Sequence, residues 1–90
     1  MIIKISNDID YQKIDDELLV FVLEDNSFYK FNKSASIIFE LIKNFEEENK
    51  IIEEFSKLYN LSKEESKKEI IDFIKDCKKK KILSHSSTGL

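Results

Sequence analysis

The stretch LLVFVLEDNSFYKFNKSASIIFELIKNF, residues 18–45, decides the fold. Leu18 to Leu23 is a continuous apolar run of strand length, and Phe28 to Phe31 is a second run rich in aromatic residues. The turn-forming residues 24–27 separate the two runs, which is typical of a hairpin. The apolar positions that follow have helical spacing: Ile38, Leu41, Ile42 and Phe45. The sequence therefore predicts a hairpin that leads directly into an amphipathic helix, with the second strand as a candidate sheet edge.

Shorter patterns on both sides complete the predicted fold. Ile2 to Ile5 and Tyr11 to Ile14 are predicted short strands, and Asn32 or Ser34 can cap the first helix. Asn49 is a plausible cap for a second helix. The side chains that we expect to point inward from this second helix are Ile51, Ile52, Phe55, Leu58 and Tyr59.

A third helix opens at Ser62, because Ser62 and Glu65 match the pattern of a capping box. We expect this helix to run to about Lys80 and the pair Ile82-Leu83 to dock as a short apolar tail. The domain then spans residues 1–83, with residues 84–90 as a flexible C-terminal tail.

The apolar side of the third helix is unusually wide. Its members span an arc of roughly 160°, whereas packing on one core needs only about 100°; they are Ile70, Ile71, Phe73, Ile74 and Cys77. Two interpretations stay open. The helix packs centrally between two neighbours, or one edge of the arc lines an exposed groove; the two are compatible, because a groove wall must also be anchored.

Composition excludes several functions. Ninety residues allow one domain, and 15 basic against 18 acidic residues give a net charge of −3, which disfavours general binding to nucleic acid or anionic membrane. No apolar run approaches the length needed to span a bilayer. The only cysteine, Cys77, cannot form an internal disulfide, so we expect a cytoplasmic protein.

The sequence contains no residue that we expect to be catalytic. His85 is the only histidine and lies in the Ser-rich end of the chain, where a solvated side chain is expected. Cys77 has helical spacing from Phe73 and Ile70, which indicates a small apolar position, and no histidine is placed to activate it. No Cys/His set can build a zinc site. We therefore expect no enzyme activity, no metal and no cofactor.

At this point the chain resembles the PqqD-like family, the element that recognises precursor peptides of ribosomally made, post-translationally modified peptides. In that family the hairpin is followed by a pattern close to Leu-Asn-x-Thr-Ala-x-x-Ile-Trp-x-Leu-Leu, and residues 31–42 read FNKSASIIFELI. Ser34, Phe39 and Ile42 are conservative replacements. The chain departs from the family at the second helix, where residues 49–53 read NKIIE, and at its end, where Lys81-Ile82-Leu83 lacks the usual glycine.

The resemblance implies an α+β fold: a three-stranded antiparallel sheet packed on three helices, similar to a winged helix-turn-helix. It implies a non-catalytic protein that binds the leader of a precursor peptide as a further strand, in a cleft beside the third helix. The partners would be that leader and a leader protease, a cyclase or a radical enzyme, in a lasso-peptide or radical-enzyme pathway.

The residues expected at this peptide-binding site come from two segments. The free edge is predicted at Phe28, Tyr29, Lys30 and Phe31. The facing helix contributes Ile70, Phe73, Ile74 and Cys77, with Lys78 and Lys81 at the rim for acidic leader residues.

Two other functions stay open. A winged-helix nucleic-acid-binding protein is the main alternative, supported by Lys78-Lys79-Lys80-Lys81. Cations at a helix C-terminus are also favoured by the helix dipole, and the chain has no Arg for reading base edges. A structural subunit or antitoxin-like partner of another protein is the second alternative.

Overall fold

A computed structural model describes residues 2–86 of the chain. The elements follow one another with short connections: β1 (Ile2–Ile5), β2 (Ile9–Ile14), β3 (Glu17–Val22), β4 (Ser27–Phe31), α1 (Lys33–Phe45), α2 (Glu48–Tyr59), α3 (Lys63–Lys79) and β5 (Leu83–Ser86). This order confirms the predicted α+β class. Within residues 2–86, no helix has the length and hydropathy needed to cross a membrane.

The main sheet has three antiparallel strands in the order β2-β3-β4. Asp15 takes a left-handed conformation (φ 57°) in the tight turn between β2 and β3, and Asn26 does the same (φ 57°) before β4. Among residues 2–86, this strand order makes β3 the central strand and β4 an edge, as the sequence predicts. The register pairs Leu18 with Phe31 and Val22 with Ser27.

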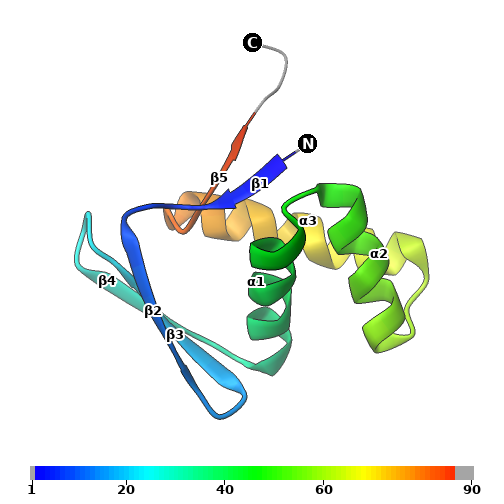
Figure 1. The fold of residues 1–90 in the computed structure, drawn as a ribbon, viewed down its shortest axis with the longest axis horizontal. Coiled ribbons are helices and arrows are strands. Elements are labelled where there is room, and N and C mark those ends of the chain that lie inside the picture. Colours follow the sequence, from blue (N-terminus) through cyan, green and yellow to red (C-terminus); the bar gives the residue numbers. More distant parts are fainter. Residues whose placement is uncertain (1, 87–90) are drawn as a thin grey trace.

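The helices cover one face of this sheet. Figure 1 shows α1 between the sheet and α2, with α3 packed behind α1. Phe39 of α1 is fully buried and contacts both Tyr11 of β2 and Phe31 of β4, with ring centroids 5.0 and 6.0 Å apart. Side-chain packing through α1 therefore joins the sheet to the rest of the core.

A second, two-stranded sheet pairs β1 with β5 in antiparallel register, and it was not predicted. Figure 1 shows these two strands side by side above the helices. Ile82 and Leu83 are buried, which confirms that this pair docks on the core. Ser84 to Ser86, predicted as part of a flexible tail, instead continue β5, because their backbone pairs with β1. Residues 87–90 of the predicted tail lie outside the described residues.

Three details of the helices also differ from prediction. The N-cap of α2 is Glu47, not Asn49: its carboxylate accepts hydrogen bonds from the backbone N–H groups of Asn49 and Lys50, at 3.2 and 2.9 Å. Leu58 and Tyr59 were expected to point inward, but Leu58 is exposed and Tyr59 is partly exposed while its ring contacts buried Phe55. Both lie on the last turn of α2. Phe45 is also exposed, at the last residue of α1.

Candidate functional site

The candidate site lies along the edge of β4. Within residues 2–86, β4 pairs with β3 on one side and with no strand on the other. An unpaired edge presents a row of backbone donors and acceptors to an incoming chain. Alternation along β4 turns Tyr29 and Phe31 toward the helices, whereas Phe28 and Lys30 are exposed on the opposite face.

Side chains from β4 and α3 meet beside this edge. The rings of Phe31 and Phe73 lie edge to face, with centroids 5.5 Å apart. Two turns further on, at the C-cap of α3, the ammonium of Lys80 lies 4.8 Å from the centre of the Tyr29 ring. Two side-chain contacts therefore bridge the gap between strand and helix.

The predicted helix residues divide into two groups. Ile70, Ile74 and Cys77 are buried and belong to the hydrophobic core, where they are closed to a ligand. Phe73 is half-buried and is the predicted helix residue that faces β4. Both interpretations of the wide apolar arc apply, since α3 contacts α2, α1 and β5 while Phe73 at the edge of the arc faces β4.

Cys77 has a further property that bears on chemistry. Burial raises the pKa of its thiol to about 12, and the nearby Asp76 carboxylate acts in the same direction. The thiol is therefore protonated at neutral pH, whereas a nucleophilic cysteine needs a thiolate.

Lys78 and Lys81, predicted at the rim of the site, lie in the last turn of α3 and just after its C-cap. Lys81 forms an ion pair with Glu24 in the turn before β4, at 2.8 Å, and Lys78 is exposed. Both line a hollow that also includes Ser6 and Asp8. The lysine that lies over a β4 side chain is Lys80, on the ring of Tyr29, and the sequence analysis did not single it out.

Lys80 is held in place by a carboxylate on its own helix. Its ammonium donates to Asp76 at 2.8 Å, and this hydrogen bond is the main reason that the pKa of Lys80 lies above its ordinary value. Lys80 therefore carries a charge at neutral pH beside Tyr29. The i, i+4 spacing of Asp76 and Lys80 was visible in the sequence, but the ring that Lys80 covers was not.

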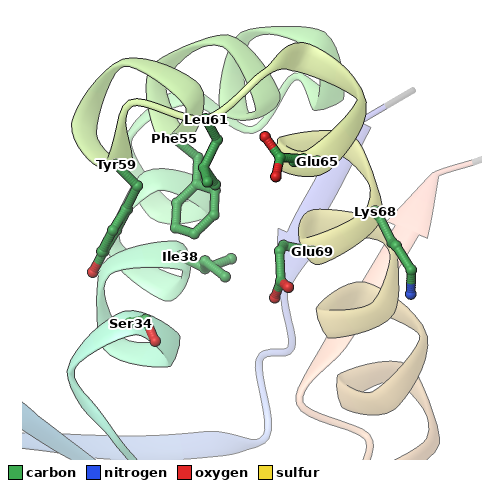
Figure 2. A pocket seen from close by; sticks show the side chains of 8 residues that line it. All are labelled: Ser34, Ile38, Phe55, Tyr59, Leu61, Glu65, Lys68 and Glu69. Atoms are coloured by element: carbon green, nitrogen blue, oxygen red, sulfur yellow. The ribbon is translucent and has the colours of Figure 1, made fainter.

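A hollow of about 520 Å³ lies beyond the other end of β4, between α1, α2 and the first half of α3. Figure 2 shows Ile38 of α1 and Phe55 of α2 facing Glu69 of α3 across this space. Ser34 lines it three residues after β4 ends, and Glu69 lies one turn before Phe73. The hollow is thus in line with the gap between β4 and α3, and no sequence pattern indicated it.

The comparisons with known proteins bear on this arrangement. A model of the family described as coenzyme PQQ synthesis protein D (PqqD) matches residues 17–83. The chain belongs to the PqqD family. A search of curated protein sequences finds no match.

Two solved structures have the same fold. A structure described as "TbiB1 in Complex with the TbiA(beta) Leader Peptide" superposes with a TM-score of 0.87 and 20% identity, over 93% of this chain and 98% of that one. A second, "Lasso peptide synthetase B1 complexed with the leader peptide", gives a TM-score of 0.83 and 9% identity, over 94% and 100% of the two chains. At these identities the likeness establishes the fold, including the three-stranded sheet and the three helices.

Proposed function

We propose that this PqqD-family protein is a non-catalytic binding protein that captures the leader of a ribosomal precursor peptide and delivers it to modifying enzymes. The observation that carries the proposal is the free edge of β4 beside α3. Family membership supports it, and both similar structures are described as complexes with a leader peptide. The whole of residues 2–86, β5 included, would act as one peptide-recognition domain.

Affinity would come from strand addition. The backbone of Ser27–Phe31 offers the leader a ladder of hydrogen bonds that does not depend on the leader's side chains. A leader that is disordered when free must be ordered on binding, so part of the binding free energy offsets that loss of entropy.

Specificity would come from the side chains that border the edge. Phe73 and Tyr29 offer apolar surface to alternate leader residues, and the hollow lined by Ile38 and Phe55 accepts a large apolar side chain. Lys80 supplies the positive charge closest to Tyr29, so it replaces Lys78 and Lys81 as the residue we assign to an acidic leader side chain.

The chemistry on the peptide is assigned to partner enzymes: a leader protease, a cyclase or a radical enzyme. The protonated thiol of Cys77 supports this division of labour. The proposal covers lasso-peptide and radical-enzyme pathways, and it places the protein in the cytoplasm, where ribosomal precursors meet their first enzymes.

Nucleic-acid binding is not favoured by the structure. Lys81 is paired with the carboxylate of Glu24, so its charge is already engaged within the molecule. The chain has no Arg for reading bases, and its net charge is −3.

Leader binding is tested by anisotropy with the fluorescently labelled leader of a precursor peptide from the same genome. Phe73→Asp places a charge at the half-buried contact with Phe31 and is expected to weaken binding at least about tenfold. Glu69→Trp fills the hollow from an exposed helix position and is expected to weaken binding by a similar factor.

Lys67→Trp is the matched control, because Lys67 is exposed on α3 and does not line the hollow. Circular dichroism establishes that each variant is folded. If folded Phe73→Asp and Glu69→Trp bind the leader as tightly as the parent, the binding site lies elsewhere.

A further inference from the structure

The face of the main sheet that turns away from the helices carries exposed aromatic side chains. Val20 and Val22 of β3 are buried against the helices, so Leu19 and Phe21 project from the other face. The register places Phe28 of β4 directly opposite Phe21. Phe21 is 38% exposed and Phe28 is 66% exposed. Leu19, Phe21 and Phe28 form what we call the outer patch.

The outer patch is concave. Its three side chains line a hollow of about 320 Å³ together with Asp10 and Gln12 of β2. Figure 1 shows the helices on the opposite side of the sheet, and no described element covers this face. Contiguous exposed apolar side chains with a polar rim are the kind of surface that soluble proteins use for interaction sites.

The size of the patch indicates the kind of partner. A fully exposed Phe side chain presents roughly 150–250 Å², so these partly exposed residues offer a few hundred Å² in total. A stable interface needs about 800 Å² from each partner. The outer patch alone is too small for a stable dimer of this chain and suits a transient contact with another protein.

The position of the patch indicates which protein. β4 belongs to both surfaces, since its free edge is the proposed leader site and its Phe28 projects into the outer patch. A leader added beside β4 would extend the same sheet. A protein seated on the outer patch would therefore lie directly beside the captured peptide.

We propose that the outer patch docks the enzyme that modifies the captured peptide, through an apolar area on that enzyme's surface. This inference rests on the proposed function, because a binding protein without chemistry of its own must hold its enzyme near the peptide. The polar rim, with Asp10 on one side and the Lys30–Glu17 ion pair (3.1 Å) on the other, limits the contact to the patch.

The test uses the full chain, the labelled leader and the enzyme that modifies that precursor. Phe21→Thr removes the central ring and keeps a residue that favours strands, on a strand that is not the leader edge. We expect enzyme binding, measured by surface plasmon resonance with leader present, to weaken at least about tenfold. Leader affinity should change by less than about twofold, because the two sites are separate.

Leu58→Gln is the matched control, since Leu58 is also an exposed apolar residue (62%) but lies on α2. Leu19→Thr serves as a second patch variant if Phe21→Thr does not fold. The docking proposal is wrong if a folded patch variant binds the enzyme as tightly as the parent, or if the parent does not bind the enzyme. Neither result contradicts leader capture. If the parent does not bind the leader, the proposed function is wrong. If sedimentation shows a dimer of the parent that Phe21→Thr dissociates, the occupant is a second copy and the proposal is wrong.

Discussion

At the scale of single residues, burial decides which members of the α3 arc can meet a ligand. Ile70 and Ile74 pack against the core, so a charge at either position would report on folding and not on binding. Phe73 lies at the edge of the arc and keeps part of its ring accessible. Helical periodicity identifies all of these as apolar positions, but it does not say which neighbours cover them.

Cys77 gives the first prediction. Because burial raises the pKa of its thiol to about 12, the unfolded thiol (ordinary pKa 9.0) ionises first as pH rises. The stabilising contribution of the neutral thiol is fully present below pH 9 and is lost between there and pH 12. Urea unfolding at pH 7 and pH 10 should therefore show that the stability advantage of the parent over Cys77→Ala shrinks at the higher pH.

Thiol labelling gives an independent check of the same residue. A thiol reagent at pH 8 should modify Cys77 slowly in the native protein and rapidly in urea. If the thiol of the native protein reacts as fast as that of the unfolded protein, the thiol is accessible and a catalytic role for Cys77 has to be considered again.

At the scale of elements, the helix caps show what local sequence can and cannot predict. The capping box of α3 was predictable, because Ser62 and Glu65 exchange hydrogen bonds of 3.1 and 3.0 Å within four residues. The cap of α2 was not, because Glu is an uncommon cap. Its position depends on Glu46, whose left-handed conformation (φ 59°) ends α1 and turns the chain.

The capping box gives the second prediction. Hydrogen bonds from the backbone and side chain of Ser62 hold the pKa of Glu65 below its ordinary value of 4.5. The ionised carboxylate therefore stabilises the fold above about pH 4.5, and this contribution is lost as pH falls through the lowered pKa. Ser62→Ala should lower the free energy of unfolding at pH 7 by roughly 1 kcal/mol.

Glu65→Gln should reduce stability less at pH 3 than at pH 7, because the parent carboxyl is increasingly protonated at the lower pH. Urea titrations monitored by circular dichroism at both pH values measure the difference. An equal effect of Glu65→Gln at the two pH values would mean that the carboxylate does not contribute through its charge.

At the scale of the whole molecule, strand order was predictable and the second sheet was not. Leu18 to Leu23 is apolar throughout and has a hairpin partner on each side, which marks it as central and β4 as an edge. The pairing of β1 with β5 joins two four-residue segments from opposite ends of the sequence, and no local pattern fixes such a pairing. The hollow near Ser34 was missed for the same reason, since residues of three helices form it.

The central claim, that the leader binds as an added strand on β4, is tested most directly by methylating single backbone nitrogens of the leader. In a strand, alternate N–H groups point toward the neighbouring strand, so the ladder uses every second donor. We predict that N-methylation weakens binding in anisotropy titrations at every second leader residue and leaves the residues between them near the parent affinity. N-methyl variants that all bind like the unmodified leader would contradict strand addition.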